Sequence, residues 1–173
     1  EPCGAWYGRW GVNYIYGTWS VLASLGAIKE DHSSAYVQKA IKWLKQNQND
    51  DGGWGESCSS YDDNSIAGYG NSTASQTAWA LLGLLSVGEY QSRAVENGVN
   101  YLVETQNTSG FWEEDYFTGT GFPKVFYLRY LGYAQYFPLW ALSVYQRCCM
   151  GVDSRQFEVM GTAAIDLHEM PRL

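Results

Sequence analysis

Apolar and polar positions define two kinds of segment along the chain. Segments of the first kind are apolar almost all round and carry one tryptophan each; they are 17–25, 77–85 and 138–146. Segments of the second kind, 33–48 and 90–106, have apolar residues three and four positions apart with polar residues between them. This periodicity predicts helices, and those that are apolar all round are expected to be buried on several sides. The pattern therefore indicates an inner and an outer layer of helices.

A loop pattern recurs after each outer segment. A shift of 58 positions relates two sets of residues: Gln48, Gly52, Trp54 and Glu56 match Gln106, Gly110, Trp112 and Glu114. Self-similarity at a fixed period is typical of repeat architectures. The order of inner helix, outer helix and loop, followed by the same order again, predicts an all-α fold of concentric helix layers. This fold is an α/α toroid of the α6-α6 barrel type, and five helices make only an incomplete sector of it.

The loop tryptophans have a structural and a functional interpretation. A glutamine near the end of an outer helix can bind backbone groups that the helix end leaves unsatisfied, while its amide stacks on the following indole. Gln48 with Trp54, and Gln106 with Trp112, would then staple helix ends to loops. The alternative is a non-catalytic binding module, for example for carbohydrate, in which Trp54 and Trp112 face solvent. The direction in which these indoles point distinguishes the two hypotheses.

Composition excludes some functions. The net charge of −7, with 11 Lys plus Arg, gives no basic stripe for a nucleic-acid backbone. No apolar run approaches the roughly 20 residues of a membrane-spanning helix, and the first ten residues lack the pattern of a signal peptide. The four cysteines and two histidines show no metal-ligand spacing, so we expect neither a metal nor another cofactor. The unusual feature is the aromatic content of 16%.

The repeated loop resembles the QW motif of class II triterpene cyclases, in which an aromatic and an aliphatic residue precede Gln and then Gly-x-Trp. The whole motif is matched by KAIKWLKQNQNDDGGW, and NGVNYLVETQNTSGFW matches it except that Asn97 replaces a basic residue. The segments GRWGVNYIYGTW, STASQTAWALLGLL and FTGTGFPKVFYLRYLGYAQYFPLWAL are similar to the C-terminal part of squalene-hopene cyclases. Oxidosqualene cyclases share the motif, but a Cys-Phe-like pair is expected from them at Asn13-Tyr14. The resemblance covers about residues 1–150.

The resemblance implies that squalene, or a similar linear triterpene, is cyclised to a pentacyclic hopanoid through carbocations in an aromatic-lined cavity. It places these residues at the cavity: Trp10, Tyr16, Phe122, Phe126, Leu128, Tyr130 and Tyr133. Tyr16 matches a tyrosine near the catalytic acid, Phe122 and Phe126 match positions near late cations, and Leu128 matches a cavity-shaping aliphatic residue. Spacings of four, four and three predict that the four aromatic residues from Phe122 to Tyr133 share one helical face, with the first step in a turn if Pro123 ends the helix.

The catalytic acid of the family lies in a D-x-D-D motif, which this sequence lacks. The acidic clusters 50–51, 62–63 and 113–115 lie in polar loops, where we expect them to be solvated. We therefore predict no catalytic residue here, and a chain that is inactive and poorly soluble without an N-terminal part of the same protein. The family also implies peripheral or monotopic attachment to the cytoplasmic side of a membrane.

A protein prenyltransferase subunit is an alternative from another class of protein. It would share the toroid, but would need Asp, Cys and His zinc ligands that the sequence does not bring together.

The resemblance also divides the chain into two parts. Residues 1–150 are expected to form part of the barrel domain, whereas 151–173 depart from the family. Disorder, divergence and a foreign origin remain open as explanations for this tail.

Overall fold

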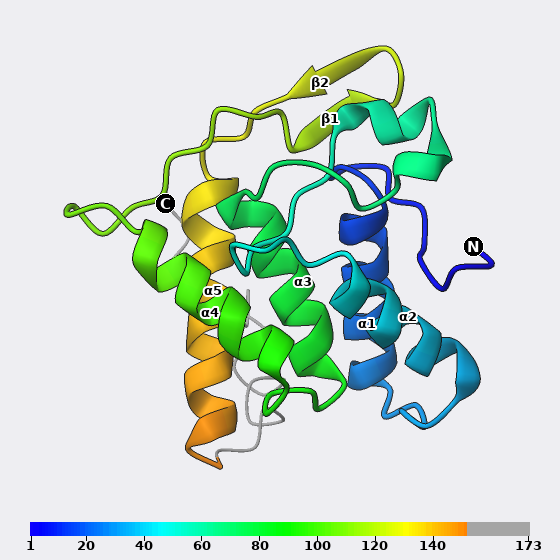
Figure 1. Ribbon diagram of the computed structural model, residues 1–173, viewed down its shortest axis with the longest axis vertical. Helices are drawn as coiled ribbons and strands as arrows, with labels where there is room; N and C mark the ends of the chain where they lie inside the picture. Colours follow the sequence, from blue (N-terminus) through cyan, green and yellow to red (C-terminus); the bar gives the residue numbers. More distant parts are fainter. Residues whose placement is uncertain (152–173) are drawn as a thin grey trace, which may run out of the picture.

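The computed structural model describes residues 1–151, and five α-helices dominate this part of the chain. The helices are α1 (Tyr14–Ala27), α2 (Ala35–Gln46), α3 (Ala74–Ser86), α4 (Arg93–Thr105) and α5 (Tyr133–Cys149). Two short 3-10 helices, η1 (Cys58–Tyr61) and η2 (Asn64–Ile66), lie between α2 and α3. A hairpin of β1 (Gly119–Phe122) and β2 (Phe126–Leu128) precedes α5 (Figure 1).

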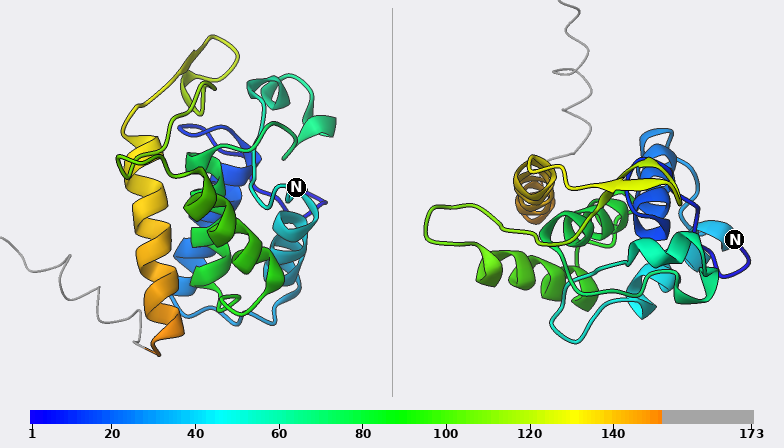
Figure 2. Two further views of the ribbon diagram at one scale, coloured as in Figure 1. Left: turned by 60° about the vertical axis from the view of Figure 1, so that its left-hand side comes forward. Right: turned by 90° about the horizontal axis from the view of Figure 1, so that it is seen from above.

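The helices form two layers, as the sequence predicts. Seen from above, α5, α3 and α1 make one row, and α4 and α2 make a second row beside it (Figure 2). Helix α3 packs between α1 and α5 in the inner row, and it also contacts α4. The predicted inner segments lie in α1, α3 and α5, and the outer ones in α2 and α4. The prediction of a sector of an α/α toroid is thus confirmed.

Helix α3 is the centre of the core. Every residue from Ala74 to Leu85 is buried, which explains why this segment is apolar nearly all round. Its N-cap is Thr73, whose hydroxyl accepts a hydrogen bond from the Gln76 N–H at 3.2 Å. Helices α2 and α4 instead bury a single apolar stripe, such as Val37, Ala40 and Leu44 in α2. The two outer helices can therefore face solvent on their other side.

The prediction of one helical face for Phe122, Phe126, Tyr130 and Tyr133 is wrong. Phe122 and Phe126 lie opposite each other in the antiparallel pair of β1 and β2, and only Tyr133 is helical. Three residues separate the two phenylalanines, and one of them, Lys124, has a positive φ of 67° that a helix does not permit. An antiparallel pair across a three-residue loop produces the same spacing of four as a helical turn.

One prediction concerns residues that the structure does not describe. The tail assigned to 151–173 lies outside the described residues apart from Gly151. Among the residues that are described, no helix has the length and apolar character required to cross a bilayer.

Candidate functional site

The two loop tryptophans lie buried against the ends of the outer helices. Trp54 donates its indole N–H to the Leu44 carbonyl of α2 at 2.8 Å, and Trp112 donates to the Leu102 carbonyl of α4 at the same distance. The backbone N–H of Trp54 also donates to the Thr77 hydroxyl at 2.9 Å, so the loop is tied to α3. Both indoles are inaccessible to a ligand on the surface. The geometry is that of staples and argues against surface binding platforms.

The glutamines make different bonds from those expected. Gln48 donates its amide N–H groups to the Gly52 carbonyl of its own loop at 2.7 Å and to the Ala94 carbonyl of α4 at 2.8 Å. It therefore links the loop to the next outer helix, whereas the indole N–H bonds the end of the preceding one. Gln106 makes the equivalent bond to the Gly110 carbonyl at 2.9 Å, at an exposed position.

A repeated glutamate caps each of the inner helices α1 and α3. Glu56 accepts backbone N–H bonds from Asn13 at 3.2 Å and Ile15 at 2.8 Å, at the start of α1. Glu114 accepts bonds from the backbone N–H and hydroxyl of Ser75, in the first turn of α3. A carboxylate at a helix N-terminus satisfies free N–H groups and opposes the positive end of the helix dipole.

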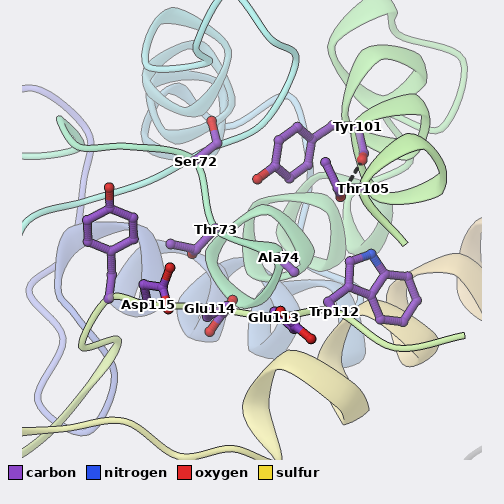
Figure 3. A pocket seen from close by; sticks show the side chains of 10 residues that line it. Ser72, Thr73, Ala74, Tyr101, Thr105, Trp112, Glu113, Glu114 and Asp115 are labelled. Atoms are coloured by element: carbon purple, nitrogen blue, oxygen red, sulfur yellow. Dashed lines mark hydrogen bonds between the residues drawn. The ribbon is translucent and has the colours of Figure 1, made fainter. Parts of the chain in front are cut away.

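Burial raises the pKa of both glutamates, although these N–H groups act in the opposite direction. The expectation that the cluster 113–115 is solvated is therefore wrong for Glu114, whereas Glu113 and Asp115 are exposed. The cavity beside Glu114, of about 120 Å³, is lined by the loop and α4 and contains none of the predicted cavity residues (Figure 3). Glu114 thus stabilises a helix end, and nothing places a reacting substrate next to it.

Aromatic rings from three inner helices and one loop contact one another in a continuous cluster, which we call the aromatic wall. Its members are Tyr16, Trp19, Trp79, Tyr130, Tyr133, Phe137 and Trp140. Trp79 is fully buried, whereas Tyr16, Tyr133 and Phe137 are half-buried. Burial raises the pKa of Tyr16 and Tyr133, so both phenols stay protonated at neutral pH. The wall is therefore aromatic and uncharged.

Two glycines allow tyrosines of the wall to lie close to the backbone. A Cβ at Gly11 would lie 2.2 Å from the Tyr16 ring, and a Cβ at Gly119 would lie 2.6 Å from the Tyr130 ring. These glycines face each other in a β-bridge between the N-terminal segment and β1. The bridge joins the segment that packs on Tyr16 to the strand that packs on Tyr130, although these segments lie more than a hundred residues apart in the sequence.

The structure brings only part of the predicted cavity set together. Tyr16, Tyr130 and Tyr133 belong to the aromatic wall. Trp10 lies on the strand-like segment beside β1, where its carbonyl accepts a 3.0 Å bond from the Thr120 N–H and its side chain is 62% exposed.

The remaining predicted residues lie on the hairpin. Phe122 and Phe126 contact each other edge to face at 5.8 Å between ring centroids and are 59% and 45% exposed. Leu128 is half-buried at the end of β2. In the described residues the hairpin positions thus make no ring contact with the wall.

Sequence reasoning assigned no role to Trp19, Trp79, Phe137 or Trp140. The signal was available, because the three tryptophans align at 60 and 61 residue intervals along the inner segments. Aromatic faces stabilise a nearby cation without acting as nucleophiles, by about 0.5–2 kcal/mol for each well-placed ring. The wall is thus suited to shelter a positive charge on an apolar ligand.

Metal chemistry finds no support in the described part of the chain. No group of three or more His, Cys, Asp or Glu side chains lies close enough there to hold a metal ion. The cysteines at positions 3, 58, 148 and 149 are free thiols. The prenyltransferase alternative, which needs zinc ligands, therefore gains nothing from the structure.

Comparison with known proteins identifies the family of this chain. The family model for the squalene-hopene cyclase C-terminal domain matches residues 1–147. The squalene–hopene cyclase of Zymomonas mobilis is 58% identical over 148 residues, which are 84% of this chain and 22% of that protein. The squalene–hopene cyclase of Alicyclobacillus acidocaldarius is 54% identical over 147 residues, covering 85% of this chain and 23% of that protein.

A dammaradiene synthase from Dryopteris crassirhizoma is 47% identical over 160 residues, which cover 84% of this chain and 23% of that protein. The chain thus spans less than a quarter of the length of these curated relatives. The matches do not favour the oxidosqualene cyclase alternative. The chain belongs to the family of squalene-hopene cyclase C-terminal domains.

Proposed function

We propose that this chain is the C-terminal portion of an enzyme that cyclises squalene, or a similar linear triterpene, through a cascade of carbocations started by protonation. Its part in the reaction is to supply one side of the cavity. The observation that carries the proposal is the aromatic wall, since its contiguous rings offer π-faces and no nucleophile to a cationic hydrocarbon. The protonating acid then belongs to another part of the same protein.

The repeat geometry supports a partner at the open end of the sector. Gly4 and Gly52 have positive φ angles and lie against the fifth residue of the next outer helix: an added Cβ would come within 2.7 Å of the Lys39 and Asn97 backbone carbonyls, respectively. Gly110 has the same positive φ, but no described atom lies within 4 Å of its Cβ position. We infer that another outer helix, from the N-terminal part of the protein, docks there.

A chimera tests the proposed activity. Residues 1–147 would replace the matching segment of the Zymomonas mobilis relative, with that unaltered relative as the positive control. Incubation with squalene, followed by gas chromatography and mass spectrometry, should reveal polycyclic triterpenes. A chimera that is folded by circular dichroism but leaves squalene unchanged would contradict the proposal. The 173-residue chain alone should form no product, because its sequence lacks the D-x-D-D motif that holds the starting acid in the family.

We also propose that the complete protein attaches to the cytoplasmic side of a membrane as a peripheral or monotopic protein. The reason is physical: a linear triterpene partitions into lipid, so an enzyme that collects it gains from contact with the bilayer. Flotation of the chimera with phospholipid vesicles would test this attachment. A chimera that stays at the bottom of the gradient, with the parent relative floating under the same conditions, would count against it.

A further inference from the structure

Trp79 is the buried member of the aromatic wall, and it joins the rings of α1 to those of α5. Its ring contacts Tyr16 edge-on at 4.9 Å and stacks parallel to Trp19 at 6.2 Å, both on α1. On α5 it contacts Tyr133 at 5.6 Å and Phe137 at 5.5 Å, again edge to face. It is the only wall residue contributed by α3, the helix that separates α1 from α5.

The indole N–H of Trp79 does not account for the presence of tryptophan at this position. The Nε1 atom is buried and has no hydrogen-bond partner among the described residues. Burying a hydrogen-bond donor without a partner lowers the stability of the folded state. Trp54 and Trp112 avoid this cost, because each donates its indole N–H to a backbone carbonyl. What Trp79 contributes is therefore its ring area and thickness, wedged between side chains of two neighbouring helices.

Tyr16 and Tyr133 need such a wedge because they belong to different helices. Tyr16 lies in the first turn of α1 and Tyr133 is the first residue of α5, and both are half-exposed on the wall. No ring contact joins them directly, whereas each contacts Trp79. Tyr16 also contacts Trp19, and Tyr133 also contacts Tyr130 and Phe137. Trp79 is the ring that both tyrosines share, so their separation and tilt relative to each other depend on it. Cation–π attraction requires the cation within about 6 Å of a ring centroid, so a displaced ring stabilises a different carbon of the cascade.

We propose that Trp79 is a positioning residue that sets the spacing of Tyr16 and Tyr133 and thereby controls where the carbocation cascade ends. The inference deepens the proposed function and rests on it for its catalytic consequence. Trp79 touches no substrate in this account, because it is fully buried. Its effect passes through the two tyrosines that it contacts.

The test uses the chimera with Trp79→Phe and Trp79→Leu. Phenylalanine keeps an aromatic ring but has a smaller ring area, and its introduction breaks no hydrogen bond, because the indole N–H has no partner among the described residues. The matched control is Trp43→Phe, because Trp43 is a buried tryptophan of the outer helix α2 that makes no ring contact with the wall. Product ratios are measured at equal conversion, together with the melting temperature of each variant.

We expect the ratio of incompletely cyclised to fully cyclised product to rise about two- to tenfold in Trp79→Phe, the range that corresponds to the loss of one aromatic pair. Trp79→Leu should give a larger rise. Trp43→Phe should lower the melting temperature and leave the ratio unchanged, since a purely structural loss reduces the amount of folded enzyme and not its selectivity. Unchanged ratios in both Trp79 variants, with folded protein, would overturn the proposal.

A second readout does not depend on turnover. With 3-fluorotyrosine incorporated, the ¹⁹F resonances of Tyr16 and Tyr133 can be assigned through single Tyr→Phe variants. Trp79→Phe should shift both resonances, and Trp43→Phe should shift neither. An unmodified chimera without activity would refute the proposed function, while the ¹⁹F shifts would still decide whether Trp79 positions the two rings. Unshifted resonances would refute the positioning role even in an active chimera.

Discussion

Replacing Trp54 by phenylalanine should destabilise the protein by about 1.5–2.5 kcal/mol. The variant loses the 2.8 Å bond from the indole N–H to the Leu44 carbonyl. That carbonyl also accepts a 3.2 Å bond from the Asn47 N–H, so it is not left without a partner and the net loss is about 0.5–1.5 kcal/mol. The smaller ring leaves a space that costs about 1 kcal/mol more.

The surroundings of Trp54 make relaxation into that space difficult. Its ring packs on Gly98 of α4, where an added Cβ would lie 2.6 Å from the indole. The backbone on either side is bound to Thr73 and Thr77 of the adjacent α3 region. Gly98 and the start of α3 are held in place by the helices to which they belong, so they cannot move into the space without loss of other contacts. Trp54→Ala, which removes the whole ring, should cost about 3–5 kcal/mol.

Thermal and urea unfolding followed by circular dichroism measure these losses, in the 173-residue chain held soluble by the same mild detergent throughout. The phenylalanine variant should melt roughly 3–10 °C below the parent chain, given 2–4 °C per kcal/mol for a chain of this size. Trp10→Phe is the matched control, because this indole is exposed and its N–H binds no described residue. It should change stability by less than about 0.5 kcal/mol. Equal losses at positions 54 and 10 would refute the staple argument.

Three other predictions follow from single contacts. Gln48→Ala removes bonds to two backbone carbonyls and should lose about 1–3 kcal/mol in urea unfolding, against less than about 0.5 kcal/mol for exposed Gln106→Ala. Burial raises the folded-state pKa of Glu56, so protonation of this side chain favours the folded state. This stabilisation is complete below the unfolded pKa of about 4.3 and is lost as the pH rises through the folded-state pKa. In pH-dependent melts, the unfolding free energy of the parent minus that of Glu56→Gln should therefore fall over this pH window and then level off. Gly17→Ala should destabilise the protein in the same melts, although alanine favours helix by about 1 kcal/mol, because its Cβ would lie 2.2 Å from the Trp6 carbonyl oxygen.

The helix layers could be predicted from sequence because burial leaves a direct periodic record. Helix α3 is enclosed by neighbours, so its sequence is apolar all round, and α2 and α4 face solvent on one side, so theirs alternate. The bonds of the loops leave a weaker record. The repeat marks Gln48 and Glu56 as special positions, but it does not reveal that Gln48 binds the next outer helix or that Glu56 is buried against α1. Those facts depend on how one unit packs on another.

The aromatic positions show where periodicity misleads. Phe122 and Phe126 are four residues apart because they pair across a hairpin, and Tyr130 and Tyr133 are three apart because they span the entry to α5. A helix predicts the same intervals, so spacing alone cannot separate the two folds. The glycines of this segment separate the two folds, because glycine disfavours a helix interior. At Gly119, Gly121 and Gly132 an aromatic ring lies where a Cβ would clash.

These glycines have a functional meaning as well. A Cβ at Gly119 would collide with Tyr130, one at Gly121 with Phe126, and one at Gly132 with Tyr136. The missing side chain of each glycine lets an aromatic ring pack directly on the backbone, and this packing holds the ring without a polar group. Of the three rings, only Tyr130 belongs to the aromatic wall, so Gly119 is the glycine of this set that bears on the proposed cavity. The irregular segment between α4 and α5 is where the sequence departs furthest from helical rules, and it holds this wall residue through close backbone packing.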